Sequence, residues 1–296
     1  MNFLRIASAL LLWPLPAAVP GIGSATFLEG SLRLLRGTSV LQGAEGLRIR
    51  QGDIFETSDK GFVQLEFTGG TVVALGPSSR FYILRQGEGH LAGKAGSQIA
   101  GEFVLLGGWL KAESNGGAGA YRYDSPLLSA TVGNGTVVIH AYDGGCDVFV
   151  ESGSATIGEV SPDGNSRQPA SAKSGQFFSR RTGKGAASVA RPNPAFLDAM
   201  PSAFRDTLPS RLAHFAGKAV EPRTEHQVAY AEVQSWLTMP ASWRRGLVDR
   251  FTPRLKDSEF RKQLEAHLAA HPEWDAILHP EKHPPENAAP APAPGS

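Results

Sequence analysis

The chain has 296 residues, of which 41% are hydrophobic and 19% are charged, so it can bury one or two ordinary cores. Its 29 basic and 28 acidic side chains leave a formal net charge of +1, which argues against nucleic acid or an anionic membrane as a partner. The composition therefore predicts a folded protein of two parts that does not bind nucleic acid.

Residues 1–25 have the pattern of a signal peptide. Arg5 supplies a positive charge, residues 6–19 form an apolar run, and Gly23 and Ala25 flank a cleavage point that we place after Ala25. A retained anchor stays open as an alternative, but the run is shorter than the roughly 20 residues that span a bilayer, and prolines interrupt it. No later segment is long and apolar enough to cross, so we expect a periplasmic protein with no transmembrane segment after cleavage.

Export often brings disulfides, yet Cys146 is the only cysteine and cannot form a bridge within the chain. It follows Asp143-Gly144-Gly145 at an expected hairpin turn, where we interpret it as a half-buried small residue. An intermolecular disulfide or a redox role remains the alternative. Stability is therefore expected to come from burial alone.

Residues 26–182 show the period-two alternation and frequent glycines of an all-β domain. One hairpin is expected at Gly69-Gly70, between strands that begin near Val63 and Val72, because only residues that tolerate positive φ fit a two-residue primed turn. A second is expected to begin at Gly133-Asn134-Gly135, and a third turns at Gly144-Gly145. Short strands without intervening helices predict a sandwich, a barrel or a short solenoid.

The strand after residue 135 is expected to present two different faces. One set of side chains points one way: Val137, Ile139 and Ala141. The other set points the opposite way: Thr136, Val138 and His140. The glycine-rich stretches 87–101 and 115–119 are expected to be exposed loops. Neither these nor Gly183-Lys184-Gly185 has the spacing of a phosphate-binding loop.

A polar linker at 183–193 separates this domain from a helical module at 194–282. Prolines cut its first part, 194–215, into short helices. We expect a capping box at Thr224-Glu225-His226-Gln227, a helix that opens near Pro240 or Ser242, and another capped by Asp257 or Ser258. The Pro/Ala-rich tail, residues 283–296, cannot build a core and is expected to be disordered.

The β region resembles the FecR-like domain, named for the periplasmic part of the ferric-citrate sensor, over residues 27–181. The resemblance rests on an ordered series of motifs rather than on any one of them. The stretch 28–32 is similar to the opening G-x-V element, 47–57 to L-x-x-G-D-x-I-x-T, and 61–67 to the strand that leads into the family's hairpin. Further along, 75–79 is similar to L-G-P-x-S, 130–136 to A-T-V-x-G-T, 148–153 to V-x-V-x-x-G, and 173–176 to the closing A-G-Q element.

The resemblance implies a role in signal reception or another interaction in the cell envelope of Gram-negative bacteria. Two features depart from the family. Gly69 replaces the hairpin Asp, and the cytoplasmic anti-sigma segment with its membrane helix has no counterpart. We therefore do not expect this chain to control a sigma factor directly, and the helical module lies outside the resemblance.

Asp53 lies in the densest motif, at 47–57. Because it follows a glycine at the start of a strand, we expect its carboxylate to accept backbone N–H groups and fix a turn; a ligand or catalytic role is the alternative. His90 and His140 are the only near-neutral bases of the β domain, and neither lies beside a catalytic motif. The sequence thus predicts no catalytic, cofactor-binding or metal-binding residue and no cofactor.

Metal binding by histidines is the strongest alternative function for the C-terminal part. His267 and His271 are four residues apart on an expected helix, and His279 and His283 repeat that interval. The first pair lacks the Glu of a zinc protease motif, so we interpret all four as solvated histidines.

We therefore expect a non-catalytic binding, scaffolding or signal-receiving module in the envelope, whose partner is an envelope protein or a peptidoglycan glycan. Two alternatives remain: a hydrolase of envelope polymers, which a cleft uniting Asp53, His90 or His140 would favour, and a metal-binding envelope protein.

Overall fold

The computed structural model describes residues 21–86, 99–117 and 119–283. Its strands are β1 Gly23–Glu29, β2 Leu32–Arg36, β3 Ser39–Gln42, β4 Arg48–Ile49, β5 Ile54–Thr57, β6 Phe62–Phe67, β7 Thr71–Leu75, β8 Arg80–Gln86, β9 Ile99–Asn115, β10 Ala120–Asp124, β11 Leu128–Tyr142, β12 Gly145–Val160, β13 Ser166–Lys173, β14 Phe177–Arg181, β15 Ala187–Val189 and β16 Arg223–Gln227. Its helices are α1 Pro194–Ala199, α2 Tyr230–Leu237, α3 Ala241–Phe251, α4 Ser258–Ala266 and α5 Asp275–Leu278, with 3₁₀ turns at Ser202–Phe204, Leu212–Phe215, Thr252–Lys256, Leu268–Ala270, Pro272–Trp274 and Pro280–Lys282. The expectation of a mainly β chain that ends in a short helical segment is confirmed.

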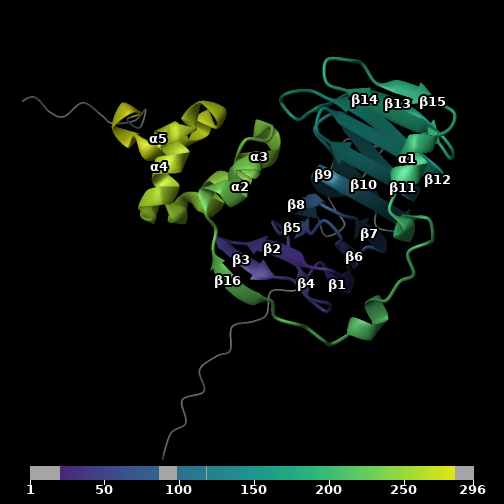
Figure 1. Cartoon of the computed structure of the whole chain (residues 1–296), viewed down its shortest axis with the longest axis horizontal. Coiled ribbons are helices and arrows are strands. Elements are labelled where there is room, and N and C mark those ends of the chain that lie inside the picture. The colour runs from purple at the N-terminus through teal and green to yellow at the C-terminus, as the bar shows by residue number, and fades with distance from the viewer. Residues whose placement is uncertain (1–20, 87–98, 118, 284–296) are drawn as a thin grey trace, which may run out of the picture.

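The strands form one hydrogen-bonded network that folds into two layers (Figure 1). Sheet I runs β16-β3-β2-β5-β8-β9-β10-β11-β12-β13, and sheet II runs β4-β1-β6-β7-β9-β11-β12-β14-β15. Three long strands, β9, β11 and β12, belong to both sheets because each one bends part of the way along. Among the described residues, all the pairings between these strands are antiparallel except that of β9 with β10. The result is a two-layer β sandwich whose layers share continuous strands.

Glycines mark the corners at which the long strands change sheets. In β9, Gly107 pairs with β8 of sheet I and the next residue, Gly108, pairs with β11 in sheet II. The corners of β11 and β12 contain Gly135 and Gly153, which lie opposite each other. Gly108, Gly135 and Gly153 have φ values of 89°, 141° and 68°, which side chains other than glycine rarely adopt. A strand can therefore turn here without ending.

The corner in β11 corrects one sequence-based prediction. Gly133-Asn134-Gly135 is not a hairpin turn, because β11 continues through it with a register shift between Val132 and Gly135. Local sequence cannot distinguish a turn from a corner, since both need glycine. The predicted hairpins at Gly69-Gly70 and Gly144-Gly145 are confirmed as the β6–β7 and β11–β12 connections.

Most of both faces of each sheet is covered. Alternate side chains enter the space between the sheets and form the main core, as Leu34, Phe55 and Val137 do. The outward side chains of sheet I, among them Leu35, pack against α2–α5. Those of sheet II, among them Val138, pack against the segment that begins with α1. This double burial accounts for strands such as β6, in which all the residues are buried.

The residues predicted as one helical module, 194–282, are thus divided between two opposite faces. Residues 194–222, here called the strap, cross sheet II, where Phe196, Phe204 and Leu208 are buried. Helices α2–α5, here called the helical cap, cover sheet I. Figure 1 shows α1 on the right of the sandwich and the cap on its left. The C-terminal third therefore completes the fold of the β sandwich on both sides.

The cap contains one wrong prediction and one confirmed one. Thr224–Gln227 is no capping box: these residues lie in β16, which pairs with β3. The helix starts later, at Tyr230, where the Glu232 carboxylate accepts the Ala229 N–H at 2.8 Å. Asp257 caps α4 as predicted, because its carboxylate accepts the first backbone N–H groups of that helix. None of the helices in the described ranges has the length and apolarity needed to span a bilayer.

The N-terminal end of the described chain bears on the cleavage site. Gly23, Ser24 and Ala25 lie in β1, where Ala25 is fully buried and pairs with Leu65. Cleavage after Ala25 would remove the first half of this strand, so the structure favours a mature chain that begins before Gly23. Export and cleavage themselves stay predictions, because residues 1–20 lie outside the described residues, as do 284–296 of the predicted tail. The predicted linker 183–193 contains β15.

Two buried ionic side chains of sheet II hold the backbone of the strap. Glu66 accepts the Ser210 hydroxyl and the N–H groups of Arg211 and Leu212. Lys111, only 1% exposed, donates to the carbonyl oxygens of Phe204 and Asp206 and pairs with Glu151 at 2.9 Å. Each charge thus meets strap groups of the opposite polarity, which offsets the cost of burying it.

We expect Gly108→Ala to destabilise the chain far more than Gly183→Ala. Both glycines have positive φ, but a Cβ on Gly108 would lie 2.4 Å from the Cα of Ser79, whereas nothing lies within 4 Å of one on Gly183. The difference should be about 1–3 kcal/mol in the free energy of unfolding, because overpacking adds to backbone strain. Urea titration of both variants measures it, and equal losses would contradict the corner model.

Glu66→Gln should loosen the strap while the sandwich stays folded. Burial opposes ionisation of Glu66, but its hydrogen bonds to Ser210, Thr26, Arg211 and Gln64 outweigh burial and lower its pKa. Its contribution is therefore complete above the unfolded pKa and is lost as the pH falls through the folded one. At neutral pH we expect trypsin to cut after Arg211 faster by on the order of tenfold, since a hydrogen bond to a charged group contributes about 1.5–3 kcal/mol.

The exposed Glu29 provides the matched control, because Glu29→Gln removes a charge from β1 without touching the strap. Unchanged cleavage at Arg211 in Glu66→Gln would show that the carboxylate does not anchor the strap.

Candidate functional site

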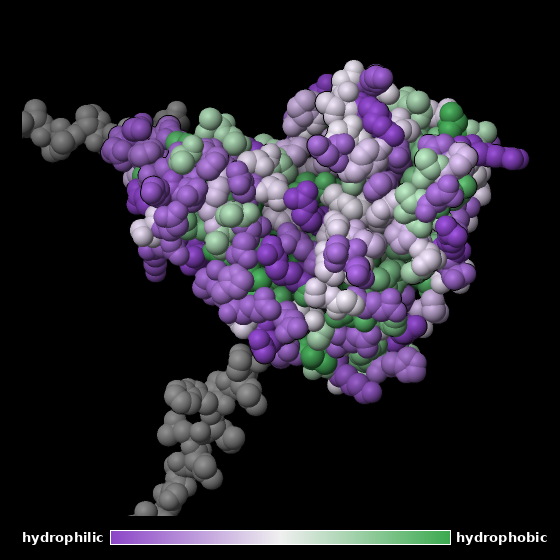
Figure 2. All heavy atoms as spheres, in the orientation of Figure 1, coloured by the Kyte–Doolittle hydropathy of each residue, from purple (hydrophilic) through white to green (hydrophobic). Residues whose placement is uncertain are grey.

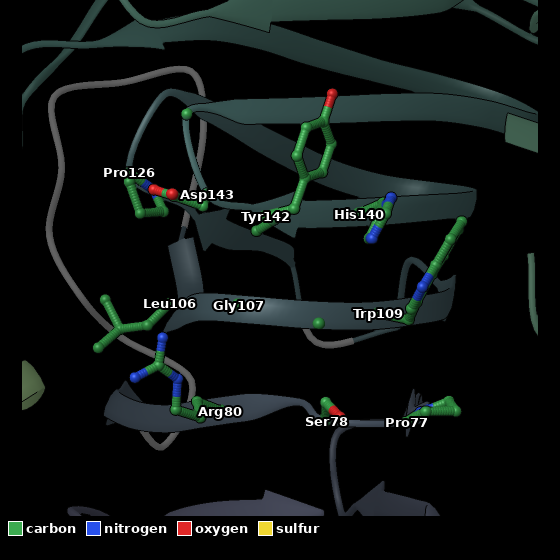
Figure 3. Close-up of a pocket in the computed structure, with 13 residues that line it drawn as sticks. Pro77, Ser78, Arg80, Leu106, Gly107, Trp109, Pro126, His140, Tyr142 and Asp143 are labelled. Carbon is green, nitrogen blue, oxygen red and sulfur yellow. The ribbon is translucent and has the colours of Figure 1, made fainter. Parts of the chain in front are cut away.

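A groove of about 670 Å³ lies at the corner of β9, between the Pro77-Ser78 turn and the β11–β12 turn (Figure 3). Arg80 and Leu106 lie at one end of it, and Trp109 and His140 lie at the other. Its lining residues come from four parts of the sandwich: Pro77, Ser78, Arg80, Leu106, Gly107, Gly108, Trp109, Pro126, His140, Ala141, Tyr142, Asp143 and Gly144. The groove therefore exists only because the long strands bend there.

The floor of the groove is a stretch of β9 whose backbone has no neighbouring strand on one side among the described residues. Val104 pairs with Asp124 of β10, and Gly108 pairs with Ala141 of β11. Between them, Leu105 and Gly107 pair with β8 and Leu106 lies at a register shift; on the opposite side, none of the three has a ladder partner among the described residues. At the corner β10 and β11 diverge, so this short edge faces the groove, where a ligand can reach backbone N–H and C=O groups.

The Pro77-Ser78-Ser79 turn forms one fixed wall. The Ser79 hydroxyl is buried, lies 2.9 Å from the carbonyl oxygen of Gly76 and 2.8 Å from that of Trp109, and accepts the Trp109 N–H at 2.9 Å. Ser78 has a φ of 51°, in the left-handed region that is rare for side chains other than glycine. The hydrogen bonds of Ser79 hold this strained turn against β9, so the wall is in place before any ligand arrives.

An aromatic stack forms the opposite end. The imidazole of His140 lies parallel to the Trp109 indole, with ring centroids 3.8 Å apart and an interplanar angle of 8°. Tyr142 lies 4.7 Å from His140, and Phe196 of the strap lies 5.3 Å from Trp109. Burial lowers the pKa of His140 to about 4, although the nearby Asp147 opposes this. The ring is therefore neutral at pH 7, and the strap supports it through Trp109.

An ion pair between Arg181 and Asp147 packs against Tyr142, the outer ring of this stack. Arg181 donates to Asp147 at 3.0 Å and lies 4.9 Å above the Tyr142 ring. The Tyr142 hydroxyl donates to the other Asp147 oxygen at 3.2 Å. Burial, with Asp147 next, raises the pKa of Tyr142 to about 12. These polar groups satisfy one another, which leaves the exposed Arg80 and Asp143 as the charged groups on the rim.

This arrangement is suited to binding rather than to acid–base chemistry. A base with a pKa of about 4 has little power to remove a proton at neutral pH. Hydrogen bonds of the described residues place no serine hydroxyl on His140. What the groove offers is a backbone edge, a neutral aromatic wall and one cation and one anion at its rim.

The residues weighed from sequence do not gather in one cleft. Asp53 precedes β5 in sheet I, where it is buried, accepts the Arg50 N–H at 2.8 Å and pairs with Arg36 at 2.6 Å. Its predicted turn-fixing role is confirmed. His140 lies in the sheet II part of β11, and His90 lies outside the described residues. The structure thus gives no support to a cleft of Asp53 with His140.

Cys146 is fully buried, not half-buried, at the β11–β12 hairpin, with its sulfur 3.0 Å from the Ser125 hydroxyl. Burial raises the pKa of its thiol to about 12, so it is an unreactive core residue.

The C-terminal histidines differ from one another in their surroundings. Helix α4 ends at Ala266, so His267 caps it and His271 follows a separate 3₁₀ turn. His271 is not solvated as expected: it is fully buried, and its Nε2 lies 3.1 Å from the Tyr230 hydroxyl. His283 contacts Asp275 at 2.8 Å. No group of three or more metal-ligating side chains occurs in the part of the chain that the structure describes.

Sequence reasoning did not find the groove residues Arg80, Trp109 and Tyr142. Trp109 follows two glycines and Tyr142 precedes a turn, which is a weak signal for a strand end with aromatic side chains. These three side chains line one groove only because β9 bends at its corner, and no local sequence pattern predicts that bend.

No protein-family model and no curated protein matches the chain. Two crystal structures of a putative anti-sigma factor from Parabacteroides distasonis are similar to part of it. One has a TM-score of 0.36 and 12% identity over 47% of this chain and 59% of the other; the second has a TM-score of 0.37 and 14% identity over 49% and 64%. This chain thus spans less than two thirds of those proteins.

We expect His140 to titrate near pH 4, rather than near its usual 6.5, when its imidazole signals are followed by NMR. Because the folded pKa lies below the unfolded one, the contribution of the neutral ring to stability is complete above about 6.5 and is lost as the pH falls towards 4. Trp109→Leu opens the stack and should move the pKa back towards 6.5. A wild-type pKa at or above 6 would disprove a buried neutral ring.

Proposed function

We propose that this chain is a non-catalytic, FecR-like binding protein of the bacterial periplasm, which takes part in signal reception or scaffolding in the cell envelope. The groove at the β9 corner is its recognition surface. The observation that supports this most is the combination of a rigid floor with an aromatic wall behind which Arg181 and Asp147 already pair with each other. Recognition residues placed on such a scaffold bind without a large ordering cost.

The ligand we propose for the groove is an envelope protein segment or a peptidoglycan glycan. Both present hydrogen-bonding groups along an extended chain, which suits the backbone edge at 105–107. The aromatic wall of His140 and Tyr142 provides flat apolar contact, and Arg80 and Asp143 can each take a partner of opposite charge. The motif series of the FecR-like domain supports the same broad role.

Fractionation of cells that produce the full chain with a C-terminal tag tests the compartment. We expect the protein among the periplasmic proteins, and intact-mass measurement should give a mature N-terminus before Gly23, because Gly23–Ala25 are needed in β1. Cytosolic material that retains Met1 would refute the periplasmic assignment.

A photo-crosslinking amino acid at position 80, in the same cells, tests the groove. We expect a discrete adduct, whose mass spectrum identifies either a protein segment or a glycan fragment. The control position is Lys60, which is exposed at the β5–β6 turn, away from the groove. Identical adducts at both positions, or none at position 80, would refute the groove as the recognition surface.

A further inference from the structure

Each sheet of the sandwich ends in two edge strands, and three of these four carry charge. Sheet I ends in β16, which contains Arg223 and Glu225, and in β13, which contains Arg167 and Lys173. Sheet II ends at one side in β4, which contains Arg48. Charges and prolines on an edge hinder the addition of a foreign strand, so these three edges are protected.

The fourth edge, β15, has the sequence Ala-Ser-Val and carries no charge. It pairs with β14 on one side, from Phe177 opposite Val189 to Ser179 opposite Ala187. On its other side, no strand of the described residues pairs with it. All three of its residues are exposed, so its backbone groups lie open to a further strand.

Apolar side chains gather around this edge. Val189 is 51% exposed and Leu197 of α1 is 39% exposed, two of the three large hydrophobic side chains that stand out as exposed in the described residues. Figure 2 shows hydrophobic residues at the surface on the right of the upper strands, where Figure 1 places β15 and α1. A partner strand would therefore meet apolar contacts on the outer face of sheet II.

A cavity of about 190 Å³ opens beside β15, at the mouth between the two sheets. Ala186 and Ser188 line it from sheet II, and Gln168 and Ala170 line it from β13 of sheet I. Its deeper lining includes three residues of the main core: Leu128, Ile157 and Phe178. Three lining residues are small, namely Ala170, Ala186 and Ser188, and the carboxylate of Glu159, which also lines the cavity, is paired with Arg180, so an aliphatic side chain can enter from this side.

The backbone on both sides of this cavity, in β13 and at the start of β15, has a fixed conformation. In β13, Gln168 has a φ of 48° and precedes Pro169, and the pairing of β13 with β12 shifts register at these two residues, so this edge is irregular beside the mouth. On the other wall, Glu159 accepts the Ala186 N–H at 2.7 Å and pairs with Arg180 at 3.3 Å. These contacts fix the start of β15, so the edge is preorganised for pairing.

From these features we infer that β15 is the acceptor edge for an extended, uncharged segment of a partner protein. The segment adds as a further strand to sheet II, and its inward aliphatic side chain fills the mouth between β13 and β15. Alternation along a strand sends every second side chain inward, so the fitting segment has apolar residues at alternate positions. This site lies apart from the β9 groove and goes beyond the function proposed for it.

Two synthetic peptides test this inference on the full mature chain. The probe is Lys-Thr-Val-Thr-Val-Thr-Lys, and its control has both valines replaced by aspartate. We expect the valine peptide alone to shift the backbone amide NMR signals of residues 185–190, 168 and 170–172. Ser188→Lys places a charge in the mouth and should weaken binding on the order of tenfold, and Ala170→Lys should do the same from the opposite wall.

Ser171→Lys is the matched control, because Ser171 is exposed between Ala170 and the buried Ala172 and thus points away from the mouth. The Ser171→Lys variant should bind the valine peptide with the same affinity as the unmodified chain. The inference is overturned if the valine peptide leaves the signals of 185–190 unmoved, or if Ser188→Lys and Ser171→Lys bind it alike. A concentration-dependent shift of these signals without peptide also overturns it, since the occupant is then a second copy. None of these readouts depends on the compartment or on adducts at position 80, so this site and the proposed function can fail separately.

Discussion

Continuity of β9, β11 and β12 through both sheets is the constraint on which the rest of the structure depends. Each strand changes sheets at a glycine, and Gly108, Gly135 and Gly153 combine positive φ with backbone contacts that leave no room for a Cβ. The two layers therefore share covalent strands and cannot slide independently. A single main core fills the space that these bends enclose.

The same bends determine why the C-terminal third is part of the fold. Two layers with apolar residues on both faces need cover on both outer sides, and one compact helical module could cover only one. The C-terminal third therefore separates into two parts, of which the strap crosses sheet II and the helical cap packs on sheet I. Polar contacts fix both, with Glu66 and Lys111 on the strap and with Arg250 of α3, which donates to the carbonyl oxygens of Leu35, Gly37 and Gly52.

Both candidate binding surfaces lie where the strand ladder is interrupted. At the β9 corner the neighbouring strands diverge and leave a short backbone edge beside His140 and Tyr142. At β15 the sheet simply ends, next to an opening into the core. Elsewhere the edges carry charges, and the strap and the helical cap cover most of the outer faces. In a fully packed sandwich, unused backbone hydrogen bonds are the groups that remain for recognition.

The sequence by itself determined the mainly β class, the hairpins at Gly69-Gly70 and Gly144-Gly145, the turn held by Asp53 and the cap at Asp257, because each depends on a few neighbouring residues. Only the tertiary structure decided that Gly133-Asn134-Gly135 is a corner, that Thr224–Gln227 joins a sheet as β16, and that Trp109, His140 and Arg80 line one groove. These outcomes depend on pairing between residues distant in the chain. Glycine, alternation and polarity look the same locally whether a strand turns, bends or ends.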